Sequence, residues 1–285
     1  MITQEQFDRT RRLALALAGI ELFDRHRELV HRRSQRLGIQ GGAGLDAVLT
    51  AAEHGDKEAG RRLIGLLTTK FTGFSRHPGH FHVAAERALE AVRRRAQARL
   101  WSAAAATGEE PYSLAVAVID AFRRNDPPAT ILATDIDEEA LAVARQGEYG
   151  EAALDALESE QRARFFGEPA GPGRWRIARA AHRLVEFRAL NLVDPVWPIE
   201  APFDVIFCRN VVMYLESDHR YSVLERMASL LAPGGVLIMD PVEHPGRAGH
   251  LFAHGTDGVY SLRPLAPTPA PGGRSPARRL EEARL

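Results

Sequence analysis

Between about residue 98 and residue 240 the sequence alternates short apolar segments with longer segments of helical spacing. The apolar segments are RLWSAA, TILATD, FDVIFC and VLIMD. The helical segments include PYSLAVAVIDAFRR, DEEALAVARQG and SDHRYSVLERMASLL. Parallel strands need a long crossover, usually a helix, so this alternation predicts an α/β fold with a mostly parallel sheet covered by helices on both faces.

The regions around this alternation have different compositions. Residues 1–67 contain one helical pattern after another, which predicts an all-α N-terminal domain, followed by an α/β domain over residues 68–264. Within the α/β domain, a Gly/Pro turn between β-like runs predicts a small antiparallel insertion at about residues 160–190. Residues 265–285 are rich in Pro, Ala and Arg, which predicts a disordered tail.

Composition excludes several classes of protein. The formal net charge is zero, which argues against a general nucleic-acid or membrane surface, and the one cysteine, Cys208, excludes an internal disulfide. The start of the chain lacks the pattern of a signal peptide and no apolar run reaches about 18 residues, so we expect a cytoplasmic protein without membrane insertion. The histidines lack metal-binding spacing, so no metal site is predicted. A monomer is the favoured oligomeric state.

The stretch WSAAAATGEEPYSLA, residues 101–115, predicts a strand, a tight turn at Gly108 and the start of a helix. A helix dipole by itself favours acids such as Glu109 and Glu110 in the first turn, and Pro111 suits that position. As a ligand site, the turn fits a dinucleotide poorly, because G-x-G-x-x-G is absent and two carboxylates would repel a pyrophosphate. A cofactor with cationic groups and no phosphate, S-adenosylmethionine (SAM), removes this conflict.

A second acid follows the next predicted strand. Asp135 ends ATD, where a carboxylate could hold the ribose hydroxyls of the cofactor. An acid in this position can equally cap the helix that follows.

These motifs, in order and spacing, resemble the chemotaxis receptor methyltransferases (CheR). The resemblance covers roughly residues 10–262 and rests on LLTTKFTGFSRHPGHF, WSAAAATGEEPYSLA, ATDIDEEALAVARQGEY, FRALNL, FDVIFCRNVVMYLE and LAPGGVL. It implies a class I (Rossmann-like) methyltransferase domain with a small β-subdomain inserted, preceded by a helical receptor-docking domain. It also implies methyl transfer from SAM, with S-adenosylhomocysteine (SAH) as product, to glutamate γ-carboxylates on the cytoplasmic domains of methyl-accepting chemoreceptors.

The resemblance also implies roles for individual residues. Either Glu109 or Glu110 would contact the cationic end of the cofactor, with Glu109 favoured, and Asp135 would bind the ribose. Asn191 would lie near the adenine, although a turn residue that bonds its own backbone is an equal reading. The full set of cofactor-binding positions implied is Thr72, Arg76, Gly108, Glu109, Asp135, Asn191, Leu192, Asn210 and Val211.

Arg76 and Tyr214 are predicted on the acceptor side. A glutamate is already ionised at neutral pH, its reference pKa being about 4.3, so the acceptor needs orientation and removal of water rather than a general base. A guanidinium can orient the carboxylate, and a tyrosine can supply a hydroxyl and an apolar wall. Without the resemblance, Arg76 would be read as a surface residue and Tyr214 as a packing residue.

Three departures from the family pattern bear on activity. Lys70 replaces an asparagine, Ser75 replaces a phenylalanine, and DPVEHPG stands where a Gly-rich, Glu-containing stretch is expected. They motivate two alternatives: a methyltransferase of the same fold with another acceptor, and a docking protein without catalysis.

Residues 24–38 form a basic segment whose plain reading is a solvated helix face. Its functional reading is a docking surface for acidic receptor helices. The basic residues concerned are Arg25, His26, Arg27, His31, Arg32, Arg33 and Arg36.

Overall fold

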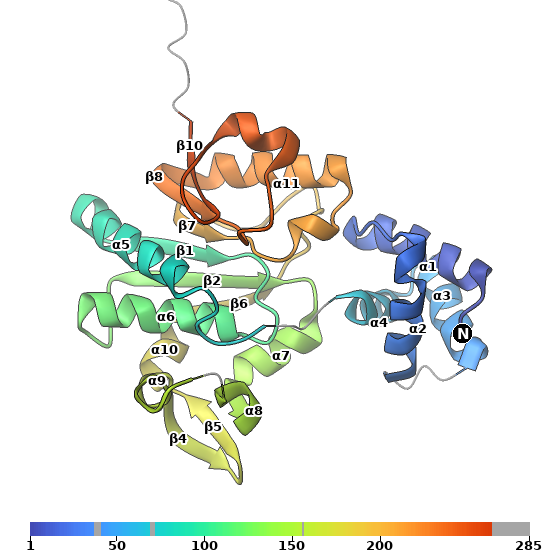
Figure 1. Cartoon of the computed structure of the whole chain (residues 1–285), viewed down its shortest axis with the longest axis horizontal. Coiled ribbons are helices and arrows are strands. Elements are labelled where there is room, and N and C mark those ends of the chain that lie inside the picture. The colour runs from blue at the N-terminus through green and yellow to red at the C-terminus, as the bar shows by residue number, and fades with distance from the viewer. Residues whose placement is uncertain (37–40, 69–71, 156, 264–285) are drawn as a thin grey trace, which may run out of the picture.

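The central element is a seven-stranded sheet with the strand order β6-β2-β1-β7-β8-β10-β9 (Figure 1). The computed structural model describes residues 1–36, 41–68, 72–155 and 157–263. Strands β6, β2, β1, β7 and β8 run parallel, while β10 is antiparallel to both β8 and β9. The predicted mostly parallel α/β fold is confirmed. The strands are β1 (Ala98–Ser102), β2 (Ala129–Asp135), β6 (Val185–Ala189), β7 (Phe203–Phe207), β8 (Leu231–Ile238), β9 (Phe252–His254) and β10 (Val259–Leu262).

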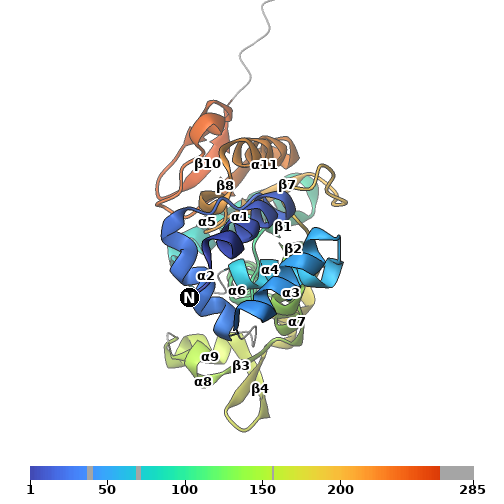
Figure 2. The same cartoon turned by 90° about the vertical axis from the view of Figure 1, so that its right-hand side faces the viewer.

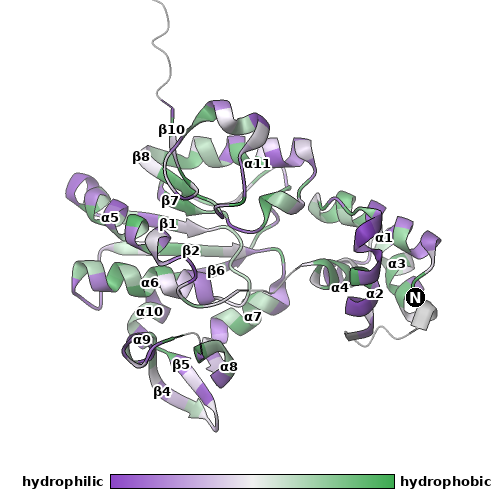
Figure 3. Cartoon of the chain, in the orientation of Figure 1, coloured by the Kyte–Doolittle hydropathy of each residue, from purple (hydrophilic) through white to green (hydrophobic). Residues whose placement is uncertain are grey.

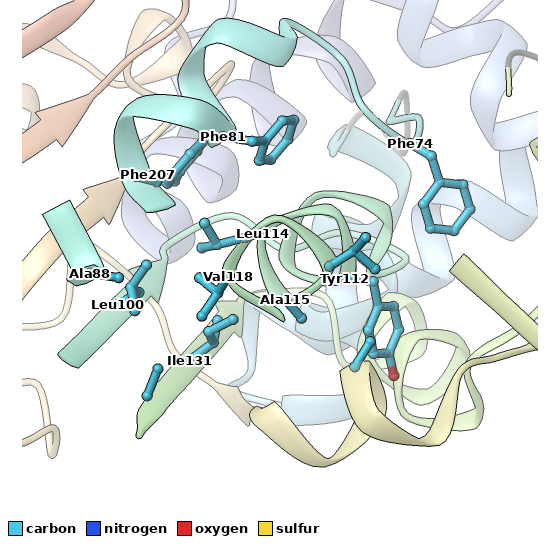
Figure 4. Packing of buried hydrophobic residues seen from close by; sticks show 14 of the residues in the cluster. Phe74, Phe81, Ala88, Leu100, Tyr112, Leu114, Ala115, Val118, Ile131 and Phe207 are labelled. Carbon is cyan, nitrogen blue, oxygen red and sulfur yellow. The ribbon is translucent and has the colours of Figure 1, made fainter. Parts of the chain in front are cut away.

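Helices cover both faces of this sheet, because alternate strand residues point to opposite sides. Leu100 packs with α5 and α6 on one face, whereas the next residue, Trp101, packs with α11 on the other. Figure 4 shows Phe81 of α5 beside Phe207 of β7, with ring centroids 5.6 Å apart. The helices of this part are α5 (Pro78–Arg95), α6 (Glu109–Phe122), α7 (Glu138–Gln146), α10 (Arg179–Leu184) and α11 (Ser217–Leu230), with 3₁₀ turns η2 (Val212–Tyr214) and η3 (Gly246–Leu251).

The N-terminal helices form a separate layer with an apolar core of their own. Phe7, Leu49 and Leu63 are fully buried within it. The parallel strands point toward this layer (Figure 1), and in Figure 2 it lies in front of their carboxyl ends. No helix in the described residues is long and apolar enough to cross a bilayer. The helices are α1 (Gln4–Ala18), α2 (Arg27–Arg36), α3 (Gly41–Glu53) and α4 (Lys57–Leu67), with the 3₁₀ turn η1 (Asp24–His26).

Residues 17–21 join this layer to the sheet. Ile20 forms an antiparallel bridge with Leu215, and the Glu21 N–H donates to the Tyr214 carbonyl at 2.9 Å. Gly19 has a φ of +63°, and a Cβ there would lie 2.6 Å from Val193 Cγ1. A glycine is therefore required at this crossing both by the backbone conformation and by space.

The small antiparallel sheet is present, with boundaries that differ from the prediction. It has the order β3-β5-β4, formed by β3 (Glu148–Gly150), β4 (Phe166–Gly171) and β5 (Arg174–Ile177), and α8 (Glu151–Leu154) and α9 (Ser159–Phe165) lie between β3 and β4. The predicted range of 160–190 omits β3 and includes β6, which pairs in parallel with β2. β3 has only three residues, too few for a period-two signal, and parallel pairing is not encoded locally.

Candidate active site

A cavity of about 420 Å³ lies at the carboxyl ends of β1, β2 and β7. The sheet side supplies the predicted residues Thr72, Arg76, Asp135, Asn191, Leu192, Asn210, Val211 and Tyr214, together with Glu110 and Arg209. The N-terminal layer closes the cavity with residues that include Ala18, Ile20, Glu21, His26, Leu29 and Arg33. Most of the residues predicted as site residues therefore meet around one cavity.

The turn at Gly108 is built by close packing. Gly108 has a φ of +100°, and a Cβ there would lie 2.8 Å from the Tyr149 hydroxyl and 2.9 Å from Ala144 Cβ. Glu109 follows it, is 8% exposed and accepts a hydrogen bond from the Thr107 hydroxyl at 2.7 Å. Burial raises the pKa of Glu109. Gly108, the N-cap of α6, and Glu109, its first residue, thus shape the turn.

Glu110, the second acid of the turn, lines the cavity. Its Oε1 accepts from the Ser102 hydroxyl at 2.9 Å, and its Oε2 accepts from Arg209 Nη1 at 3.1 Å. Burial raises the pKa of Glu110, while the Arg209 charge opposes the rise. The preference for Glu109 as the cofactor contact is accordingly revised in favour of Glu110. Both acids were evident from the sequence, but which of the two side chains points into the cavity depends on the tertiary structure.

Asp135 lies at the end of β2 and does not cap the next helix. Its two carboxylate oxygens accept from the backbone N–H groups of Ala106 and Asp137 at 2.8 and 2.9 Å. The cap of α7 is Asp137, which accepts from the Ala140 N–H. Burial raises the pKa of Asp135. The alternative reading of Asp135 as a helix cap is therefore wrong.

Asn191 is a turn residue, which is one of the two readings given to it from the sequence, and its place near the adenine stays a prediction. Its Oδ1 accepts from the Val193 N–H, as a turn residue does, and its Nδ2 donates to the Leu17 carbonyl at 2.8 Å. It also lines the cavity, as does its neighbour Leu192. Asn191 therefore ties the turn after β6 to the end of α1.

The loop after β7 carries Arg209, Asn210 and Val211. Asn210 has a φ of +55°, and its N–H donates to Glu243 Oε2 at 2.8 Å. Its Nδ2 donates to Asp240 Oδ2 at 3.0 Å. Both acids belong to the stretch DPVEHPG after β8. This stretch therefore holds the Asn210 loop in place.

Arg76 and Tyr214 line the cavity and reach solvent, so we take their side of the cavity to be its outer end. The Arg76 side chain is 37% exposed and Tyr214 is 41% exposed, whereas the Arg209 side chain is 3% exposed. The segment before Arg76 is anchored by Phe74, which packs edge-on against three aromatic rings. Ser75 donates its N–H to Ser113 Oγ at 2.9 Å. Lys70 lies outside the described residues.

Arg209 was not predicted as a site residue. It is buried, and its Nε and Nη2 have no hydrogen-bond partner within the described part of the chain. The sequence signal that could have identified Arg209 was its position directly after an apolar strand and next to Asn210. The cavity residues from the N-terminal layer had no comparable signal, because their approach to the sheet depends on the tertiary structure.

The donor set fits SAM. Acidic and cationic side chains, Glu110 and Arg209, line the same cavity, and SAM carries ammonium, sulfonium and carboxylate groups. Arg209 has buried N–H groups still to be satisfied. Asp135 and Asn191 add polar groups suited to hydroxyls and a base, and the apolar wall includes Leu190, Leu192 and Val211.

Comparison with known proteins bears out the resemblance. Residues 70–246 match the model of the CheR methyltransferase, SAM binding domain. Chemotaxis protein methyltransferase 2 of Pseudomonas aeruginosa is 38% identical over 264 residues, which cover 91% of this chain and 93% of that protein. The chemotaxis protein methyltransferase of Salmonella typhimurium is 35% identical over 92% of this chain and 91% of its own length. That of Escherichia coli is 34% identical over 92% of both chains. The chain therefore belongs to the CheR methyltransferase family, with the class I methyltransferase fold and SAM as its cofactor.

Proposed function

We propose that this protein methylates the γ-carboxylate of glutamates on the cytoplasmic helices of chemoreceptors. The observation that carries the proposal is the placement of Arg76 and Tyr214 at the exposed end of a cavity whose inner wall holds Glu110 and Asp135. The similarity to three chemotaxis protein methyltransferases supports the same substrate class.

The inner wall would hold the cofactor. SAM supplies an electrophilic methyl group and leaves as SAH. Glu110 would face the cationic end, Asp135 the ribose and Asn191 the adenine. The other cofactor positions would be Thr72, Arg76, Leu192, Asn210 and Val211, with Gly108 and Glu109 building the turn that presents Glu110.

The outer end would hold the acceptor. A glutamate carboxylate is ionised at neutral pH, so the residues around it have to orient one oxygen and remove its water. Arg76 can orient the carboxylate through its planar guanidinium, and Tyr214 can donate its hydroxyl. Neither role requires proton transfer, which agrees with a site built from charges and hydrogen-bond donors.

The N-terminal helices would dock the receptor, as a domain over residues 1–67. Figure 3 colours α2 mostly hydrophilic, yet its arginines differ in what they do. Arg27 donates to the Ile2 carbonyl and Arg33 to the carbonyls that end α4, so both stabilise the layer itself. Arg25, in the preceding turn η1, and Arg32 are exposed and remain the best candidates for contact with an acidic helix, while the side chain of Arg36 lies outside the described residues.

The test is incubation of the purified protein with methyl-labelled SAM and purified receptor cytoplasmic domains. Base-labile label in the receptor, lost when the acceptor glutamates are changed to alanine, is the expected result. Label that is base-stable or appears only in another protein would support the same-fold enzyme with another acceptor. Bound SAM with no transfer to any acceptor would support the docking protein without catalysis.

A further inference from the structure

Asp240, two residues after the end of β8, faces an unusual number of donors. It is 4% exposed, and its Oδ2 lies 3.0 Å from Asn210 Nδ2. The same oxygen lies 3.9 Å from Arg76 Nη2, 3.9 Å from Arg209 Nη2 and 3.8 Å from His77 Nε2. One buried carboxylate thus contacts three residues that line the cavity and one that adjoins Arg76.

The position of Asp240 is fixed from its own loop. Its Oδ1 accepts from the Val242 N–H at 3.3 Å. Glu243, in the same loop, accepts from the N–H groups of Asp240, Asn210 and Met213. The loops after β7 and β8 are therefore held together by two buried acids, and Asp240 is the one that also faces the arginines.

The charges of the arginines beside the cavity explain why a buried acid is needed behind the residues that line it. Arg76 and Arg209 are permanent cations, and among the described residues Asp240 faces both of them, while Glu110 pairs with Arg209. Although burial alone would raise the pKa of Asp240, the bonds from Val242 and Asn210 and the charges of Arg209 and His77 hold it below its ordinary value. Asp240 is therefore ionised at neutral pH. Replacing it with a neutral residue would remove one negative charge from beside a cavity that takes a cationic cofactor.

We propose that Asp240 is a positioning residue that neutralises Arg76 and Arg209 and holds Asn210, so that the cavity accepts the positively charged SAM. The proposal goes beyond the predicted cofactor contacts, because Asp240 is not among the positions that the resemblance implied. It rests on the proposed function only for the role of Arg76 toward the acceptor.

The charge difference between two ligands provides the test. SAM carries one more positive charge than SAH, together with the transferable methyl group, while the rest of the molecule is shared. In the whole 285-residue chain, Asp240→Asn keeps the shape and removes the charge. We expect calorimetry to give a dissociation constant for SAM that rises about fivefold, the effect of one partly screened charge, with that for SAH changed by less than about twofold.

Asp204→Asn is the matched control. Asp204 is likewise buried and paired with an arginine, Arg95, but it lies at the start of β7, away from the cavity. This control should leave the ratio of SAM to SAH affinity unchanged, and Asp240→Glu, which keeps the charge, should retain more of the wild-type ratio than Asp240→Asn. An equal change for both ligands in Asp240→Asn would reduce Asp240 to a structural residue and overturn the proposal, as would no change.

If Asp240→Asn does not fold, as judged by circular dichroism, Asp240→Ser provides the same comparison of SAM with SAH. These measurements need no receptor. A failed receptor assay would therefore contradict the proposed function but not this inference. An unchanged ratio of SAM to SAH affinity in Asp240→Asn would contradict this inference but not the proposed function.

Discussion

Arg209 Nη1 lies 3.1 Å from Glu110 Oε2, and the pair forms part of the wall of the cofactor cavity. Breaking such a pair from one side leaves the other charge buried without compensation. We expect Glu110→Gln to weaken SAM binding at least tenfold and to lower the free energy of unfolding by about 3 kcal/mol. Calorimetry and urea denaturation measure the two effects.

The matched control for this change is Glu109→Gln, one residue earlier in the same turn. Glu109 accepts from the Thr107 hydroxyl, and Glu110 is the one that lines the cavity. SAM affinity should fall by less than about threefold. A larger loss in Glu109→Gln than in Glu110→Gln would restore the original preference for Glu109.

The pH dependence of cofactor binding follows from the same pair. Burial raises the pKa of Glu110 above its ordinary value, so the carboxylate takes up a proton earlier on acidification than an exposed glutamate does. The protonated form cannot attract the cationic cofactor. SAM affinity should therefore fall as the pH is lowered from about 8 to about 5, and SAH affinity should fall less. In Glu110→Gln this difference between the ligands should flatten; an unchanged slope would exclude Glu110 as its source.

Arg76 separates acceptor orientation from cofactor binding. Because it lies at the exposed end of the cavity, Arg76→Ala should reduce receptor methylation by about 100-fold while changing SAM affinity by less than about threefold. Arg76→Lys keeps the charge without the planar fork and should recover only part of the activity. Equal losses of methylation and SAM affinity would contradict the assignment of Arg76 to the acceptor.

Gly19 tests the crossing between the N-terminal layer and the sheet. Gly19→Ala forces a side chain into the left-handed backbone region and against Val193 and His219, so we expect a loss of about 2–3 kcal/mol of stability. Gly55→Ala is the matched control, because Gly55 has a φ of +84° with nothing within 4 Å of its would-be Cβ. It should lose only the backbone contribution, about 1 kcal/mol. Equal midpoints in thermal melts of the two variants would show that the close approach at Gly19 carries no cost.

The exposed arginines of the N-terminal layer test receptor docking. The double change Arg25→Glu and Arg32→Glu should raise the KM for the receptor about tenfold at low salt and much less at high salt, with SAM affinity unchanged. Arg12→Glu, on an exposed position of α1, is the control and should have little effect. A salt-independent loss, or an equal loss in the control, would argue against electrostatic docking through Arg25 and Arg32.

Much of the fold could be predicted because its signals are local. Apolar segments such as that ending at Phe207 and helix starts such as that at Glu109 depend on residues close in the chain. β3, with three residues, and the parallel pairing of β6 could not be predicted, since their partners are distant in the sequence.

The features of the candidate site also divide into those that the local sequence predicts and those that depend on the tertiary structure. The sequence by itself determined the methyltransferase family, the turn at Gly108 and the acids that point to a cationic cofactor, because these are carried by contiguous motifs. The tertiary structure decided that Glu110 rather than Glu109 lines the cavity, that residues of the N-terminal layer close it, and that Asp240 reaches Arg76 and Arg209. The physical reason is that side-chain direction and charge compensation depend on the packing of segments that are distant in the sequence, such as those that carry Arg76 and Asp240.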